Sequence, residues 1–229
     1  MCQTVLDESI LGRARKNGLI TIYCHNIRDY TLNKHRRVDD YPYGGGQGMI
    51  MGPEAIANCF DAIIGQTKER PYFIYMSPQG KSFNQETAKK YANMNNLVIL
   101  CGHYEGVDER LIEEYIDEEI SIGDFVLTGG ELPALCIADA VARMIPGVLS
   151  ENVCFEDESH YSGMLEYPQY TRPPEWRSRK VPDVLLSGHH ANIEKWQRKM
   201  SLLRTKERRS DLFRKIELTK NDEKLLSDE

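Results

Sequence analysis

The chain has 229 residues, of which 41% are hydrophobic and 28% charged, and its net charge is −6 at pH 7. This composition is globular and excludes disordered and fibrous chains, while the length fits one large domain with a small appendage. No apolar run approaches the roughly 20 residues of a membrane helix and no signal peptide opens the chain, so we expect a cytoplasmic protein without a membrane partner.

Short apolar runs alternate with helical patterns as far as residue 145. This alternation is typical of βαβ units and predicts an α/β fold with a mostly parallel sheet. The predicted strands are Ile20–Cys24, Tyr72–Met76, Leu97–Cys101 and Glu119–Ile122. The predicted helices are Pro53–Ile64, a helix that Ser82 caps and that runs through Tyr91, Val107–Ile116 and Glu131–Ile145.

Two of these helices carry recognisable end signals. In the first, apolar residues recur on one helix face, with Pro53 at the start and Gly65 just beyond the end. In the second, Ser82 followed three residues later by Gln85 matches a capping box.

The helical pattern lapses after Pro146, where the sequence turns acidic and loses any sustained period. Such a stretch predicts an interdomain linker at 149–165, between a first domain at 1–148 and a second at 166–229. Within the second domain, Ile193, Trp196, Met200 and Leu203 recur at helical spacing. We therefore expect a small all-helical domain at the C-terminus.

The six cysteines are scattered without a Cys-x-x-Cys pair, at Cys2, Cys24, Cys59, Cys101, Cys136 and Cys154. Their spacing indicates neither a zinc site nor a disulfide framework. It predicts small buried thiols in a reducing compartment.

Charge is distributed unevenly between the two predicted domains. Residues 172–216 contain 13 Lys and Arg against 5 acids, which makes this segment +8 and the remainder −14. The global charge of −6 argues against a nucleic-acid partner, whereas a basic face on a small domain favours one. A solvated helix face is the alternative explanation of the same residues.

Three candidate strands end in loops rich in glycine and short polar residues, at 75–80, 102–106 and 122–130. Ligands of open parallel sheets bind beyond the carboxyl ends of the strands, so these loops predict one pocket. Each glycine alone would be explained by a turn, but three such loops at successive strand ends favour a binding site.

Another loop, 41–48, contains four glycines, which suits either an anion nest or a mobile flap with Tyr41 and Tyr43 available for base stacking. It lacks the Gly-Lys-Ser/Thr ending of a P-loop. Further along, Asp157 and Glu158 lie in the predicted linker, where either could act as a general base, and Arg143 lies near a helix end. Solvated acids and an arginine that serves the helix dipole are the plainer alternatives.

Five longer motifs follow one another along the chain: YMSPQG (75–80), CGHYEGVDER (101–110), SIGDFVLTGGELP (121–133), YPQYTRP (167–173) and LLSGHH (185–190). They closely resemble bacterial tRNA (guanine-N1)-methyltransferases of the TrmD type, over essentially the whole chain. The resemblance implies a SPOUT-class α/β domain threaded as a deep trefoil knot, a flexible linker and a helical domain. It also implies a homodimer with shared active sites, which transfers a methyl group from S-adenosylmethionine to N1 of the guanosine at tRNA position 37.

The resemblance further implies roles for individual residues. Glu158, where relatives usually have Asp, would remove the N1 proton, Arg143 would stabilise negative charge on guanine O6, and Glu105 would orient the base or the cofactor. The residues implied around the cofactor are Tyr75, Met76, Ser77, Pro78, Gly102, Tyr104, Glu105, Ser121, Ile122, Gly123, Phe125, Leu127, Gly129 and Gly130. Those implied against the tRNA anticodon arm are Arg172, Tyr170, Arg198, Lys199, Arg204 and Arg208. Mg²⁺ is implied as well, with no ligands indicated.

Relatives begin with an apolar strand ahead of the position of Met1, so the resemblance predicts that the coding frame extends upstream or that the chain was cut there. Two other functions are open from the residues: a non-catalytic RNA-binding protein, and a nucleotide hydrolase that uses the 44–48 loop. The intact strand-end motifs disfavour the first, and the missing Lys-Ser/Thr disfavours the second.

Overall fold

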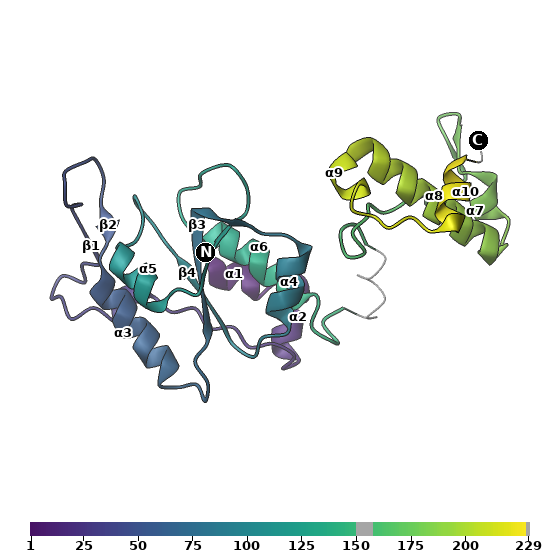
Figure 1. Ribbon diagram of the computed structural model, residues 1–229. Coiled ribbons are helices and arrows are strands. Elements are labelled where there is room, and N and C mark those ends of the chain that lie inside the picture. Colours follow the sequence, from purple (N-terminus) through teal and green to yellow (C-terminus); the bar gives the residue numbers. More distant parts are fainter. Residues whose placement is uncertain (150–157, 228–229) are drawn as a thin grey trace. The chain divides into compact units, whose positions relative to one another are not determined.

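The computed structural model describes residues 1–149 and 158–227 (Figure 1). The chain divides into two compact units, Met1–Glu151 and Asn152–Glu229. Over the described ranges, none of the helices combines the length and the apolar character that crossing a bilayer requires.

The first unit is built on a parallel sheet of three strands. β3 (Tyr72–Ser82) lies between β4 (Leu97–Cys101) and β5 (Glu118–Ser121), in the order β4-β3-β5. The strands predicted at 72–76, 97–101 and 119–122 are thereby confirmed, and so is the mixed α/β class. A separate antiparallel pair, β1 (Asp39–Asp40) with β2 (Ile50–Met51), closes the base of the glycine-rich loop between them.

Helices cover both sides of the strands. α3 (Pro53–Ile64) and α5 (Glu109–Tyr115) lie on one side, and α4 (Gln85–Ala92) and α6 (Glu131–Ala142) lie on the other (Figure 1). α3 has the predicted bounds, whereas α5 and α6 are shorter than the predicted helices.

The side chains of β3 point alternately into two apolar cores. Phe73 and Tyr75 join the core under α3 and α5, while Ile74 and Met76 join the core under α4 and α6. A strand buried on both faces needs apolar residues at every position. This explains why the sequence of β3 begins as a continuous apolar run.

A partly buried carboxylate joins α4 to the sheet. Glu118 of β5 accepts hydrogen bonds from the hydroxyls of Tyr72 and Tyr91 at 3.0 and 2.9 Å, and from Lys90 at 2.7 Å. Burial opposes ionisation of Glu118, but these three donors outweigh it and lower the pKa of the carboxyl. The hydroxyl of the fully buried Tyr91 therefore has a hydrogen-bond partner.

The predicted strand Ile20–Cys24 is wrong. This segment follows α1 (Cys2–Leu6) and α2 (Ser9–Lys16), and among the described residues it pairs with no strand. Ile20 and Ile22 instead pack on the apolar residues of α1, α2 and α6.

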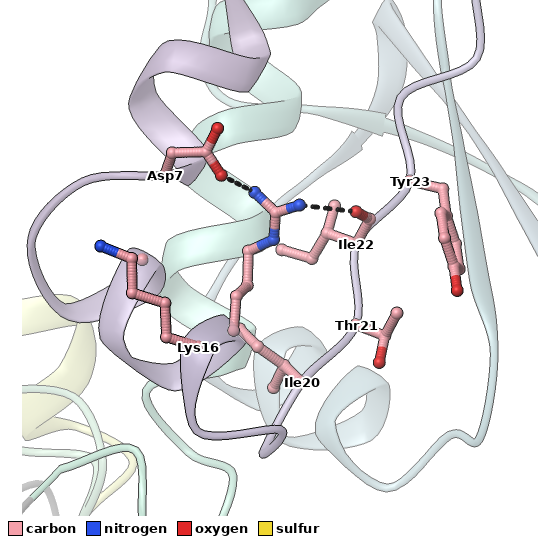
Figure 2. Close-up of a pocket in the computed structure, with 8 residues that line it drawn as sticks. Asp7, Lys16, Ile20, Thr21, Ile22 and Tyr23 are labelled. Atoms are coloured by element: carbon pink, nitrogen blue, oxygen red, sulfur yellow. Dashed lines mark hydrogen bonds and ion pairs between the residues drawn. The ribbon is translucent and has the colours of Figure 1, made fainter.

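Arg15 of α2 also holds this segment and lines a surface hollow of about 340 Å³ together with Ile20, Ile22 and Tyr23 (Figure 2). Its guanidinium pairs with Asp7 and donates to the carbonyl of Ile22 at 3.1 Å. The apolar residues of 20–24 are thus explained by packing against helices. Periodicity alone does not distinguish such a segment from a β-strand.

The predicted cap of α4 also differs from the structure. Ser82 is the last residue of β3, and Asn84 caps the helix by accepting the N–H of Thr87 at 3.0 Å. Serine and asparagine are both good N-caps, so the residue that caps α4 depends on where β3 ends.

The second unit is not all-helical. It contains α7 (Asp183–Leu186), α8 (His190–Arg208), α9 (Ser210–Phe213) and α10 (Lys220–Ser227), preceded by a hairpin of β6 (Glu175–Trp176) and β7 (Arg179–Lys180). Arg177 and Ser178 form the turn with φ of 47° and 63°. Two left-handed residues are what a tight hairpin needs, but no Gly or Asn marks them in the sequence, so the turn escaped prediction.

An ion pair joins the two longest helices of this unit. Arg198 of α8 donates two hydrogen bonds to Asp222 of α10, at 2.8 and 2.9 Å, and the Asp222 side chain is only 3% exposed. The Arg198 guanidinium holds the pKa of Asp222 well below its usual range despite burial, and Thr219 contributes further hydrogen bonds. Arg198, expected on tRNA, is therefore engaged in holding the helices together.

We predict that Asp222→Ala lowers the free energy of unfolding of the second unit by about 2–4 kcal/mol, because it leaves a partly buried guanidinium unpaired. Both tryptophans, Trp176 and Trp196, lie in this unit, so tryptophan fluorescence during urea unfolding measures it selectively. The control is Asp211→Ala, which removes the exposed partner of Arg209 and is expected to leave the midpoint unchanged.

The difference in the free energy of unfolding between Asp222→Ala and the unsubstituted protein is also expected to depend on pH. A carboxyl whose pKa is depressed by folding contributes stability above its unfolded pKa, about 3.9, and loses it as the pH falls through the folded value. The two unfolding curves therefore converge in strong acid. Equal stabilities at pH 7 would contradict the assignment.

Candidate active site

The first element of the site is an excursion in β3. Met76 and Lys81 both stand opposite Ile120 of β5, so the four residues 77–80 form a bulge in the carboxyl-terminal half of β3. A Cβ at Gly80 would lie 2.4 Å from the main chain of Glu119, which reserves this position for glycine.

The second element is the loop that follows β4, residues 102–106. A Cβ at Gly102 would lie 2.9 Å from the Tyr75 ring, so the loop packs directly on β3. Its shape is fixed by two main-chain hydrogen bonds to the segment around β2, from Glu105 N–H to Met49 at 3.0 Å and from Met51 N–H to Gly106 at 2.9 Å. Tyr104 adopts a left-handed φ of 61° within it.

The third element is the loop 122–130 between β5 and α6. Its end meets the β4 loop, because Gly130 N–H donates to the carbonyl of Gly102 at 2.9 Å. A Cβ at Gly130 would lie 2.7 Å from Cα of Cys101. The second and third predicted loops thus meet at the carboxyl ends of their parallel strands, where ligand sites in such sheets lie, while the first loop packs against β5 through Gly80.

One side-chain contact crosses this junction. His103 Nε2 lies 2.5 Å from Glu131 Oε1, and a Cβ at Gly129 would collide with both side chains. Sequence patterns alone do not single out either residue, because each occurs inside a longer motif. Their contact links the β4 loop to the first turn of α6.

The Cys101 thiol and the Tyr75 phenol, which lie beside the loop that follows β4, are neutral at pH 7. Burial raises the pKa of Cys101 to about 12, with Glu131 adding to the shift. Burial also raises the pKa of Tyr75, reinforced by Glu119 and Glu109. Neither residue is therefore suited to act as an anionic nucleophile.

The residues expected around the cofactor fall into two groups. The buried ones are Tyr75, Met76, Ser77, Ser121 and Gly130, and the partly or largely exposed ones include Pro78, Tyr104, Glu105, Ile122, Phe125 and Leu127. Met76 belongs to the apolar core, so only its main chain is available to a ligand. Ser121 hydrogen-bonds with Gly123 and shapes the start of the third loop.

The glycine-rich loop reaches the same neighbourhood. A Cβ at Gly48 would lie 2.5 Å from the side chain of Glu105, so the loop confines that carboxylate. Tyr41 and Tyr43 are 75% and 99% exposed, as expected of residues in a flap rather than in a core.

The remaining expected residues are divided between the two units. Arg143 caps the C-terminus of α6 and is partly buried. Glu158 is partly buried in the second unit, where its carbonyl accepts the Tyr161 N–H at 3.3 Å, and Asp157 lies outside the described residues. Glu158 belongs to the second unit, and the three loops belong to the first.

The residues expected on tRNA differ in availability. Arg172, Tyr170 and Arg208 are exposed, and Lys199 is partly buried. Arg204 donates to the carbonyl of Glu166 at 3.3 Å, and Arg198 is held by Asp222. Trp196 contacts the rings of Tyr167 and Tyr170, which confirms that it packs within the unit.

Across 1–149 and 158–227, no group of three or more His, Cys, Asp or Glu is placed to hold a metal ion. The Mg²⁺ that the resemblance implies stays a prediction.

Comparison with known proteins identifies the family. A model described as tRNA (guanine-1)-methyltransferase TrmD matches residues 1–215. The chain belongs to this family. It is 59% identical to a tRNA (guanine-N(1)-)-methyltransferase of Ruminiclostridium cellulolyticum over 93% of this chain and 91% of the relative. It is 57% identical to the protein of that name from Clostridium acetobutylicum, over 98% and 91% of the two chains.

A third relative, from Clostridium perfringens strain 13, carries the same name and is 55% identical over 97% of this chain and 93% of its own length. Membership of a methyltransferase family implies S-adenosylmethionine as the methyl donor. The converging glycine loops are the part of the fold that could receive it.

We predict that Gly130→Ala weakens binding of S-adenosylmethionine about tenfold or more, equivalent to ~1.4 kcal/mol, because the added Cβ meets main-chain atoms that cannot rotate away. Isothermal titration calorimetry measures the affinity. The control is Gly65→Ala at the end of α3, where the nearest atom to a Cβ is 3.4 Å away. Unchanged affinity in the Gly130→Ala protein would show that this junction does not shape the site.

Proposed function

We propose that this chain is a cytoplasmic enzyme that transfers the methyl group of S-adenosylmethionine to N1 of the guanosine at tRNA position 37. One observation supports the proposal: in a chain of this family, the glycine-bearing loops after β4 and β5 meet at the carboxyl ends of these strands, through the Gly130–Gly102 hydrogen bond. A non-catalytic RNA-binding protein would have no need of such a junction.

The cofactor would lie against the main chain of these loops. Where glycines remove side chains, N–H and C=O groups are accessible to the polar edge of an adenine. Exposed apolar side chains at Phe125 and Leu127 supply contact area on the third loop. When bound, S-adenosylmethionine supplies an activated methyl group on a sulfonium.

The acceptor nitrogen carries a proton that must be removed before its lone pair can attack. We assign this step to Glu158, which takes the N1 proton as the N1–carbon bond forms and the carbon–sulfur bond breaks, with the bonding pair leaving on sulfur. Arg143 stabilises the negative charge that develops on guanine O6. Glu105, confined by Gly48, orients the base or the cofactor.

Glu158 and the three loops belong to different compact units. The proposed reaction therefore requires the two units, of one subunit or of two, to close on the target nucleotide together. A homodimer with shared active sites meets this requirement and is part of the proposal, as is the trefoil knot of the family's catalytic domain. The +8 segment 172–216 would hold the anticodon arm.

The direct test is transfer of labelled methyl from S-adenosylmethionine to tRNA transcripts. We expect label on a transcript with guanosine at position 37 and none on the same transcript with adenosine there, because adenine offers no N1 proton and no O6. Mapping of the product by nuclease digestion and mass spectrometry identifies N1. A folded protein that binds tRNA without transferring label would favour the non-catalytic alternative.

A second test addresses the proposed base. Glu158→Gln is expected to lower kcat about 100-fold or more with little change in cofactor affinity, because the amide cannot accept the N1 proton. Glu194→Gln, an exposed acid on α8, is the matched control. Full single-turnover activity of Glu158→Gln would rule out this carboxylate.

A further inference from the structure

The hairpin β6–β7 is an exposed element of the second unit that none of the expected roles uses. Glu175 stands opposite Lys180 and Trp176 opposite Arg179 in its register, and Val181 N–H closes it on Pro174 at 2.9 Å. All residues from 171 to 180 are exposed. The turn at Arg177 and Ser178 therefore lies at the surface of the unit.

Trp176 is unusual because a large apolar ring is left at this surface. The residue is 56% exposed, and the Arg177 guanidinium lies 4.7 Å from the ring centroid. The other tryptophan, Trp196, is partly buried and contacts two tyrosine rings. Burial thus explains Trp196 but not Trp176.

The cations of the hairpin and its approach form no ion pairs with carboxylates. Among the described residues this holds for Arg172, Arg177, Arg179 and Lys180, whereas Arg198 and Arg209 of the same unit are paired. The hairpin with Arg172 carries four positive charges and one acid, Glu175. Arg177 contacts the Trp176 ring and Arg179 stands opposite it, so exposed cations and an aromatic ring occur together on a hairpin that is complementary to a polyanion with flat rings.

We propose that the tip of this hairpin is a stacking site for an unpaired nucleotide of the RNA substrate, with Trp176 as the platform. The base stacks on the exposed indole, Arg177 adds a cation–π contact, and Arg179 and Lys180 bind the flanking phosphates. This proposal rests on the proposed function and adds a contact that is distinct from the target guanosine.

The chemistry favours single-stranded RNA over a protein partner or a duplex. A duplex hides the faces of its bases, whereas loop nucleotides can be unstacked onto aromatic or guanidinium planes. Nucleic-acid interfaces are much more positively charged than protein–protein interfaces, and the hairpin with Arg172 carries four cations against one acid. The anticodon loop of a tRNA supplies unpaired bases and phosphates together.

Fluorescence tests the contact directly. The Trp196→Phe protein retains an aromatic ring in the packed cluster and leaves Trp176 as the only tryptophan. Stacking of a base is expected to quench its emission when an unmodified tRNA transcript is added, in proportion to the bound fraction measured independently by filter binding. Saturated binding with unchanged emission would overturn the proposal.

Kinetics provide the second measurement. Trp176→Ala is expected to raise KM for tRNA about 5-fold to 100-fold, the range of one lost base stack, while Trp176→Phe retains most of the affinity. Cofactor affinity and the urea midpoint stay unchanged in both variants. Leu186→Ala, which removes another exposed apolar side chain of the same unit, is the matched control.

The phosphate contacts have their own signature. Lys180→Ala is expected to lower the slope of log binding constant against log salt by about 1, because one counterion fewer is released. Equal losses in Trp176→Phe and Trp176→Ala would overturn stacking, as would quenching that depends on protein concentration without RNA. If no tRNA is methylated, the proposed function is wrong. If tRNA is methylated and the Trp176 variants keep the KM of the unsubstituted protein, only the stacking site is wrong.

Discussion

The parallel arrangement of β4, β3 and β5 is the constraint on which the candidate site depends. Parallel strands send their carboxyl ends to one edge, so three loops that are far apart in sequence must share a small volume there. The volume is so small that Gly102 approaches the Tyr75 ring and Gly130 approaches the main chain of Cys101. Glycine is needed at these positions because any Cβ would separate loops whose contact forms the site.

The second unit depends on a different interaction, a partly buried ion pair. Arg198 and Asp222 connect α8 to α10, and Thr219 satisfies the rest of the carboxylate. This pair divides the basic residues of the segment into those that hold the unit together and those that remain available to an outside polyanion. The exposed hairpin cations, which pair with no carboxylate in the part of the chain that the structure describes, belong to the second group.

The sequence predictions succeeded where a local pattern had one physical explanation. Helix 53–64 has a proline that fits the first turn, a glycine beyond its end and one apolar face, and the structure has these bounds. Segment 20–24 failed because its apolar residues face helices rather than a neighbouring strand. The hairpin at 175–180 was missed because arginine and serine take left-handed turn positions that usually require glycine or asparagine.

Composition, periodicity and motif order by themselves determined the α/β class, the main strands and helices, the family and the charge division that the net value of −6 conceals. These properties are local or additive, so the order of residues is enough to reveal them. Only the tertiary structure decided which glycines touch across loops, that His103 meets Glu131, that Arg198 is held by Asp222 and that Trp176 stays exposed. Each of these depends on residues distant in sequence, and their contact or exposure is set by the packing of whole elements.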